Sequence, residues 1–448
     1  MKHTLPCLLL LLALFAIAGC RPAPLDEEPG ATAAPAQPAP TATAEPTPPP
    51  LSTPTGEARG RAAAFCPELP RPALMLFVAA GDAGQTPAGD VQLLDPFGGA
   101  SCVLPVGDLL PGRVALAGGS LFFIDPGASE PDVDVIVRVG PDGVRTPLSF
   151  TAVETAEGAF ISGFAVSDDG ERVAWGVSDP SRSQDGVVNR LWVADVGSGA
   201  IVAMAVAPVG AGVVPEEGTP SASAPEEDAS ARDVDVVQSA LAPIRFSADG
   251  SALFFTRQPL GVGGSWVAFA GRYDNLYTLD LTERAPEPAL IFDCTIRTLF
   301  MCLGDFYAEG AEVTRLAYVN EEDRAVMITT GGGQDINALG TDADYIGAPT
   351  FNRSGELFYY TAVLADVDAG PPLPEMGTLL RVAPPTADPE PLASQPRLLP
   401  PLAFLDDEHA VVNLVEGDGV WGIGIVGVDG SVQRLELPAG ATFVGVAR

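Results

Sequence analysis

A short pattern that repeats along this chain of 448 residues is the feature that most constrains its fold. Residues 160–207 read FISGFAVSDDGERVAWGVSDPSRSQDGVVNRLWVADVGSGAIVAMAVA, where apolar runs of strand length are separated by Asp-Gly or Gly-Ser-Gly turns. Asp tolerates the left-handed backbone region and Gly enters it without steric cost, so such turns favour tight reversals between antiparallel strands. The segment therefore predicts a four-stranded antiparallel meander.

Similar segments recur as far as the C-terminal residues, and this repetition predicts the architecture. One meander alone cannot bury both of its faces, whereas meanders arranged around an axis cover one another. The 49 Gly and 44 Pro disfavour long helices, and many short apolar runs bounded by turns are typical of all-β proteins. We therefore expect an all-β fold within residues 62–448: a β-propeller of about seven four-stranded blades, with six or eight as alternatives.

The end of the chain predicts how the ring is closed. The first blade has apolar runs at residues 73–79, 91–94 and 103–106 but lacks an inner strand. Residues 442–447, TFVGVA, form one further apolar run with no blade of its own. Pairing of this last strand with the first blade removes the open edge, so we expect the C-terminal strand to close the propeller.

Two blades depend on weaker patterns. The second blade is expected to end with an outer strand at residues 144–150. The fifth shows clear runs at residues 313–319 and 325–329 and a weaker one near Ile336. The expected number of blades therefore depends most on the fifth.

The turns and later strands of several blades resemble a known repeat. Residues 246–250 (FSADG), 166–170 (VSDDG) and 351–355 (FNRSG) resemble the F-S-P-D-G turn of TolB-like, WD40-like propeller repeats. Residues 191–195 (LWVAD) and 276–280 (LYTLD) resemble the L-W-x-x-D element of the same repeats. This resemblance implies protein partners in a cell-envelope assembly, which are met through loops at the axial face.

The N-terminal residues predict export and a lipid anchor. Residues 1–19 have the apolar run of a signal peptide, too short to span a bilayer comfortably. The sequence Ile-Ala-Gly-Cys that ends at Cys20 resembles a bacterial lipobox, which implies lipidation of Cys20 and attachment to the outer face of the cell membrane or to the outer membrane. An ordinary secretory signal is the alternative. Residues 20–61, rich in Pro, Ala and Thr, are expected to form a disordered tether.

The charge of the chain limits its partners. It carries 58 acidic and 24 basic residues, a net charge of −34, which disfavours binding to nucleic acid. An acidic insert rich in Pro and Ser at residues 208–239 is expected to be a disordered loop between the third and fourth blades. We expect a monomer.

Four cysteines follow the lipobox, and an even number in an exported chain predicts disulfides. Pairing the cysteines that are nearest in sequence joins Cys66 to Cys102 and Cys294 to Cys302. In a chain-entropy model these two disulfides stabilise the fold by about 3.8 and 2.6 kcal/mol. Free thiols are the alternative. The spacings do not match paired zinc ligands, and His409 is the only histidine after the signal peptide, so no zinc site is expected.

The polar candidates for chemistry have simpler structural explanations. His409 is the sole candidate for an imidazole base, but the chain has no G-x-S-x-G nucleophile motif, so we assign it to an acidic turn. Carboxylates are good calcium ligands, yet none of the acidic pairs matches an EF-hand loop. The pairs considered are Asp132 with Asp134 and Asp342 with Asp344. Residues 331–333, GGG, are expected to form a turn, since no lysine or helix follows them.

Trp192, Trp266 and Trp421 are candidates for a sugar-binding groove, although packing within blades is favoured. With no catalytic residue, metal or cofactor identified, we expect that the chain is not an enzyme. The predicted function is that of an exported lipoprotein whose propeller is a binding scaffold for a protein or polysaccharide in the envelope. The alternatives are an extracellular propeller enzyme acting on carbohydrate and a substrate-capturing lipoprotein of an uptake system.

Overall fold

The computed structural model describes residues 65–79, 89–104, 114–126, 132–155, 158–179, 187–208, 239–259, 273, 275–293, 303–320, 323–332, 335–364, 374–382, 388–416, 420–438 and 441–447. Cys20, the expected signal peptide and the expected tether lie outside these ranges. So do Cys294, Cys302 and residues 209–238 of the insert.

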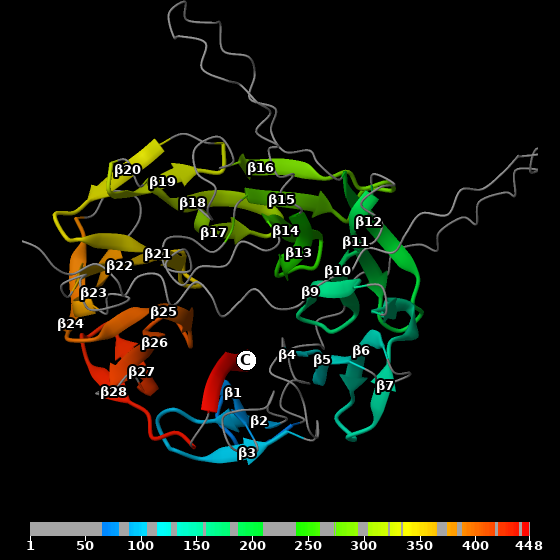
Figure 1. Ribbon diagram of the computed structural model, residues 1–448, viewed down its shortest axis with the longest axis horizontal. Coiled ribbons are helices and arrows are strands. Elements are labelled where there is room, and N and C mark those ends of the chain that lie inside the picture. Colours follow the sequence, from blue (N-terminus) through cyan, green and yellow to red (C-terminus); the bar gives the residue numbers. More distant parts are fainter. Residues whose placement is uncertain are drawn as a thin grey trace, which may run out of the picture. The chain divides into compact units, whose positions relative to one another are not determined.

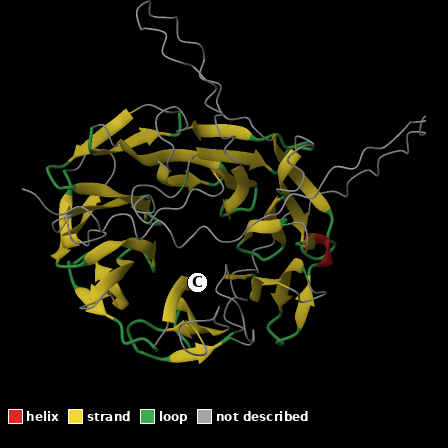
Figure 2. Ribbon diagram, viewed as in Figure 1, coloured by secondary structure: helices red, strands yellow, loops and turns green. Residues whose placement is uncertain are grey.

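Seven antiparallel sheets are arranged in a ring (Figure 1), which confirms the prediction of a β-propeller with seven blades. Six sheets have four strands, and the sheet of the second blade has a short fifth one. The only helix among the described residues is a 3-10 turn, η3 (Ser149–Thr151), and Figure 2 shows the predominance of strands. No described helix has the length and apolar character needed to cross a membrane.

The strands run from the inside of the ring to its outside in chain order, except in the first blade (Figure 1). Blade 1 contains β29 (Ala441–Ala447), β1 (Ala73–Ala79), β2 (Gly89–Leu94) and β3 (Ser101–Val103). Blade 2 contains β4 (Val114–Ala117), β5 (Ser120–Pro126), β6 (Val133–Val139), β7 (Arg145–Pro147) and β8 (Val153–Glu154). Blade 3 contains β9 (Phe160–Val166), β10 (Arg172–Ser178), β11 (Val187–Asp195) and β12 (Ile201–Pro208).

The remaining four blades follow the same order. Blade 4 contains β13 (Ser239–Phe246), β14 (Ala252–Pro259), β15 (Asn275–Asp280) and β16 (Ala289–Asp293). Blade 5 contains β17 (Leu303–Glu309), β18 (Glu312–Asn320), β19 (Ala325–Thr330) and β20 (Asp335–Gly340). Blade 6 contains β21 (Tyr345–Phe351), β22 (Leu357–Leu364), β23 (Pro374–Val382) and β24 (Glu390–Gln395). Blade 7 contains β25 (Leu398–Phe404), β26 (His409–Glu416), β27 (Val420–Gly427) and β28 (Val432–Arg434).

The C-terminal strand closes the ring, as the sequence predicts. β29 pairs antiparallel with β1, in a register that places Ala447 opposite Ala73 and Thr442 opposite Phe77. Val444 and Ala447 of β29 belong to the cluster that blade 1 shares with blade 2. Phe443 and Val446 pack against the cluster shared with blade 7. The C-terminal strand therefore supplies apolar contacts to both interfaces of blade 1, with blade 2 and with blade 7.

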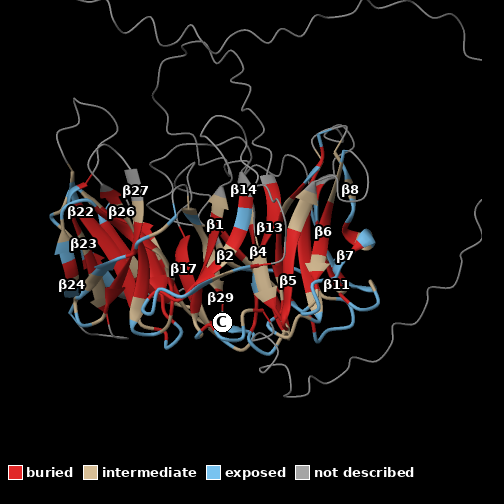
Figure 3. Cartoon of the chain, turned by 90° about the horizontal axis from the view of Figure 1, so that it is seen from below, coloured by how far each residue is buried: buried red, intermediate tan, exposed pale blue. Residues whose placement is uncertain are grey.

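The hydrophobic core lies between neighbouring blades. One cluster of buried side chains occupies each of the seven interfaces, and Figure 3 shows burial along the strands with exposed residues at their connections. Each blade therefore covers the faces of its two neighbours, which is the burial that a single meander cannot provide.

The Ser-x-Asp-Gly turns are held by their own side chains. In blade 4, the Ser247 hydroxyl donates to Asp249 Oδ1 at 2.6 Å and accepts from the backbone N–H of Ala252 at 2.9 Å. The hydrogen bond from Ser247 lowers the pKa of the Asp249 carboxyl below its ordinary value. Gly250 has a φ of 69°, which a glycine adopts without strain. The residue types of this turn are therefore explained by local hydrogen bonding.

Arginines link these turns to the preceding blade. Arg172 of blade 3 donates from Nη1 to the carbonyl oxygen of Gly250 in blade 4, at 2.6 Å. Arg315 of blade 5 makes the same contact with the carbonyl oxygen of Gly355 in blade 6, at 2.5 Å. Each of these turns therefore connects two strands and also supplies a carbonyl oxygen that accepts a hydrogen bond from the preceding blade.

The inner strand of blade 5, β17, is not among the strands predicted from the sequence. Its sequence LGDFYAE places an acidic residue, Asp305, among the four buried residues at the start of the strand. The Asp305 carboxylate accepts a hydrogen bond of 2.9 Å from the backbone N–H of Phe351 in blade 6. A tertiary contact therefore allows this residue to be buried, which a local hydrophobic pattern does not reveal.

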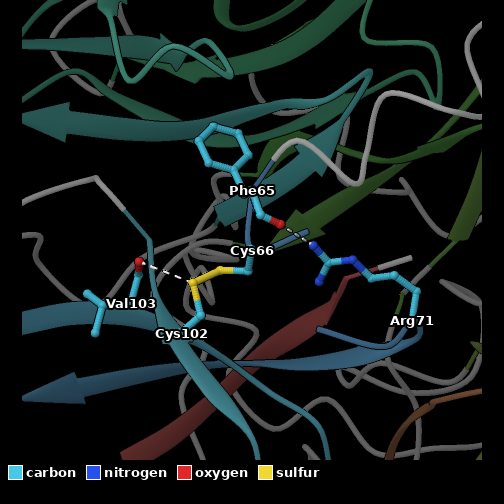
Figure 4. The surroundings of a disulfide bond; sticks show 5 residues. All are labelled: Phe65, Cys66, Arg71, Cys102 and Val103. Atoms are coloured by element: carbon cyan, nitrogen blue, oxygen red, sulfur yellow. Dashed lines mark hydrogen bonds between the residues drawn. A yellow bond between two sulfur atoms is a disulfide. The ribbon is translucent and has the colours of Figure 1, made fainter. Parts of the chain in front are cut away.

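Cys66 and Cys102 form a disulfide, with Cα atoms 6.1 Å apart, as the sequence-based pairing proposes (Figure 4). Cys102 lies in β3, and the chain around Cys66 is further held by Arg71, whose Nη2 donates to the carbonyl oxygen of Phe65 at 2.6 Å. The bond therefore fastens the segment before β1 to the outer strand of blade 1.

Replacing both Cys66 and Cys102 with alanine is expected to lower the free energy of unfolding by about 2–4 kcal/mol. The disulfide joins residues 36 positions apart, and without it the unfolded chain is no longer restricted by this crosslink. Urea unfolding of the oxidised wild-type protein and of the double variant measures the difference. Equal unfolding midpoints and slopes for the two proteins would contradict a stabilising role.

Candidate functional site

A pocket of 480 Å³ lies on blade 3, where it meets blade 2 at the outside of the ring. Three aromatic and four aliphatic residues line it, together with one glycine, one acidic and one basic residue. The lining residues are Phe150, Ala152, Val153, Trp175, Val177, Asp179, Arg190, Trp192, Gly199 and Ile201.

The outer strand of blade 2 is interrupted beside the pocket. The strand expected at residues 144–150 is present but shorter: β7 covers Arg145–Pro147, and the chain then turns into η3. After this turn the chain returns as β8, which pairs with the beginning of β6, whereas β7 pairs with its end. Two short strands therefore share the outer edge of β6, and η3 lies between them.

Buried hydrogen bonds hold η3 in place. The hydroxyl of Thr151, which is fully buried, donates to the carbonyl oxygen of Leu148 at 2.8 Å. The hydroxyl oxygen of Thr151 also accepts from the backbone N–H of Ile136 in β6 at 2.9 Å. Since Ile136 also accepts from the backbone N–H of Leu148, the turn is tied to the strand on both sides. Hydrogen bonds of the Thr151 hydroxyl thus take the place of backbone pairing with β6 at this point. The turn that they hold places Phe150 against blade 3.

Two tryptophans on neighbouring strands form the floor of the pocket. Trp175 of β10 and Trp192 of β11 are directly paired in the register. Their rings are stacked, with centroids 5.7 Å apart and planes 20° from parallel. Phe150 lies 5.8 Å from the Trp175 ring. Trp175 is buried whereas Trp192 and Phe150 are partly exposed, so these two rings are the ones that a ligand can contact.

The turn between β11 and β12 shapes one wall. Gly199 has a φ of 71°, and its N–H donates to the carbonyl oxygen of Asp195 at 2.8 Å. A Cβ atom at this position would lie 2.8 Å from the ring of Phe150. Glycine is therefore required here both by the backbone conformation and by the close approach of the aromatic ring.

Arg190 and Asp179 supply the charge of the pocket. Arg190 precedes Trp192 by two residues in β11, so the two side chains are on the same face of the strand. Val177, which precedes Asp179 by two residues, is paired with Arg190 in the register. The site therefore combines an aromatic surface with a cation and a carboxylate, and it can bind a ligand that has both an apolar face and polar groups.

One of the three tryptophans proposed from the sequence lies in the pocket, namely Trp192. Trp421 lies in β27 of blade 7, and Trp266 is outside the described residues. Sequence reasoning missed Trp175, although VAWGV and RLWVA are similar runs on consecutive strands. Aligning these two runs as a hairpin places the tryptophans opposite each other, a signal that was present in the sequence.

His409 lies elsewhere on the ring, at the start of β26. Its Nδ1 is 2.8 Å from Asp406 Oδ1, and its ring meets Phe97 of blade 1 edge-on, with centroids 4.8 Å apart. The histidine therefore lies at the seam between the last and first blades and contributes nothing to the pocket.

Strand pairing and hydrogen bonds involve several of the acidic residues that were considered as calcium ligands. Asp134 is in β6 opposite Val153 of β8, and the carbonyl oxygen of Asp132 accepts from Thr155. Asp344 Oδ2 accepts from the backbone N–H of Leu364 at 3.0 Å. Within the described part of the chain, no group of three or more His, Cys, Asp or Glu side chains is placed to hold a metal ion.

The fold defines the class of the protein, a seven-bladed β-propeller. No family model matches the sequence, and no curated protein matches it. Several solved structures do resemble it in fold. A putative 6-phosphogluconolactonase from Bacteroides fragilis has 13% identity and a TM-score of 0.44, over 84% of this chain and 97% of that one. A periplasmic gluconolactonase from Pseudomonas aeruginosa has 14% identity and a TM-score of 0.45, over 83% and 99%.

An oligogalacturonate lyase in complex with manganese also resembles the chain, with 12% identity and a TM-score of 0.46, over 82% of this chain and 85% of that one. These similarities correct the prediction that the chain is not an enzyme, because the propellers it resembles bear the names of enzymes. That prediction depended on the failure to identify a catalytic residue, metal or cofactor in the sequence. At these identities the likeness shows the fold and assigns no reaction.

Proposed function

We propose that this protein is an exported propeller that recognises carbohydrate, either as the substrate of an extracellular enzyme or as a captured ligand for uptake. The observation that carries the proposal is the pocket in which Trp192 and Phe150 lie beside Arg190 and Asp179. One face of a sugar ring is apolar and packs on aromatic carbon, while its hydroxyl groups form hydrogen bonds with planar polar side chains.

Features of the N-terminal part support the cellular location. The lipobox that ends at Cys20 and the composition of residues 20–61 favour a lipid-anchored protein on a tether outside the cytoplasm. The Cys66–Cys102 disulfide is typical of an oxidising compartment. In this proposal the protein is a TolB-like propeller-repeat lipoprotein, and its partner is an extracellular saccharide.

Replacing Trp192 with alanine is expected to weaken saccharide binding about tenfold, because the aromatic contact with the sugar ring is lost. A glycan array identifies ligands of the wild-type protein, and isothermal titration calorimetry compares their affinities for the two proteins. Val363→Ala, which truncates an exposed apolar side chain of blade 6, is the control and should bind as the wild type does.

The saccharides found by the glycan array also distinguish an enzyme from a protein that captures its ligand. Incubation with the protein followed by mass spectrometry detects conversion of the saccharide, which indicates an enzyme. Recovery of an unchanged but bound saccharide indicates capture. Binding of no glycan, or equal binding by the wild-type and Trp192→Ala proteins, would refute the assignment of a carbohydrate site.

A further inference from the structure

We propose that the pocket is selective for anionic saccharides, whose carboxylate or phosphate group is held by Arg190. This inference rests on the carbohydrate site proposed above and names the class of sugar that it takes. The observations that support it are the surroundings of Arg190 and its place relative to Trp192.

Arg190 differs from most arginines of the propeller in its contacts. Arg172, Arg245 and Arg315 each donate to a carbonyl oxygen of the following blade. Arg381 forms an ion pair with Glu356. Arg190, in contrast, is exposed and makes no hydrogen bond or ion pair within the part of the chain that the structure describes. Its five N–H donors are therefore available to a ligand.

The guanidinium group suits an anion of a particular shape. Its planar fork donates two parallel hydrogen bonds to the two oxygens of a carboxylate or to two oxygens of a phosphate. The chain has a net charge of −34, so its average field repels anions. Binding of an acidic sugar therefore requires a local cation, and Arg190 is the cation among the residues that line the pocket.

The register of blade 3 sets the orientation of the ligand. Arg190 and Trp192 are two residues apart on one face of β11, so a sugar ring packed on Trp192 has its charged substituent within reach of Arg190. The Asp179 carboxylate lines the same pocket, where it repels an anion and accepts hydrogen bonds from hydroxyl groups. The two charges together favour one direction of binding.

Replacing Arg190 with glutamine tests the inference. Titration calorimetry with neutral, uronic-acid-containing and phosphorylated glycans compares the wild type with Arg190→Gln and Arg190→Lys. Arg284→Gln is the matched control, since it removes the same charge from an exposed turn between β15 and β16. We expect Arg190→Gln to weaken binding of anionic glycans by about ten- to a hundredfold, because charge-assisted hydrogen bonds are lost.

Arg190→Lys should restore part of the affinity, because it keeps the charge without the planar fork. Arg284→Gln should bind every glycan as the wild type does, and the two Arg190 variants should lose far less affinity for neutral glycans than for anionic ones. The uronic-acid and phosphate arms identify which anion the site takes. Preferential binding of neutral glycans, or unchanged binding of acidic ones by Arg190→Gln, would overturn the inference while Trp192→Ala still tests the carbohydrate site. Absence of all glycan binding by the wild type would instead reject the carbohydrate site itself.

Discussion

Replacing Ala447 with aspartate is expected to destabilise the propeller by about 3 kcal/mol or more, because it places a charge in an apolar cluster without a partner. Ala447 is fully buried, lies opposite Ala73 and belongs to the cluster between blades 1 and 2. β29 is the strand that closes the ring, so its loss exposes the edge of β1 and the apolar contacts on both sides of blade 1. Urea unfolding followed by tryptophan fluorescence measures the change.

Thr442→Asp is the matched control, since it adds the same charge to an exposed position of the same strand. It should leave the unfolding midpoint close to that of the wild type. Similar midpoints for the Ala447→Asp and wild-type proteins would show that closure through β29 does not stabilise the ring.

Replacing Gly176 with alanine is expected to separate blades 3 and 4 and to cost about 1–3 kcal/mol of stability. A Cβ atom at this position would lie 1.9 Å from the carbonyl oxygen of Leu241 in blade 4 and 2.5 Å from Ser162 Oγ. The Ser162 hydroxyl donates to the same carbonyl oxygen at 2.7 Å, so the two blades are already in direct contact there. Backbone atoms form the obstacle, and they cannot move aside as a flexible side chain can.

Gly340→Ala serves as the comparison, because a Cβ atom at this position would have no other atom within 4 Å and β20 is an outer strand. This substitution should be neutral or slightly stabilising, since alanine restricts the unfolded chain more than glycine does. Chemical unfolding of both variants provides the test. Because Gly176 lies between Trp175 and Val177, the Gly176→Ala protein should also bind saccharide more weakly. Equal stability of the two variants would argue against tight contact between the blades.

Much of the fold could be predicted from local patterns. The turns at residues 166–170 and 246–250 combine Ser, Asp and Gly, whose side-chain and backbone preferences are local. The apolar run at residues 442–447 predicted ring closure because it had no blade of its own. The inner strand β17 was missed, since the burial of Asp305 depends on the backbone of Phe351 in another blade.

The candidate site was predictable only in part. Trp192 was named as a possible sugar contact, whereas its partner Trp175 was missed, although the similar runs VAWGV and RLWVA pair the two tryptophans when aligned as a hairpin, as β10 and β11 do. Phe150 was assigned to a strand, because residues 144–150 are mostly compatible with one. The hydrogen bonds of Thr151 hold this segment in the turn η3 instead, where Phe150 lines the pocket.

The sequence by itself determined the repeating meanders and the strand that closes the ring, because turn chemistry and apolar runs are local properties of the chain. The tertiary structure alone decided where a pocket opens and which side chains meet in it. Those features depend on how one blade covers the next, and the contacts involved join residues as far apart as Phe150 and Trp175. Such contacts follow from packing between blades, for which a local pattern carries no signal.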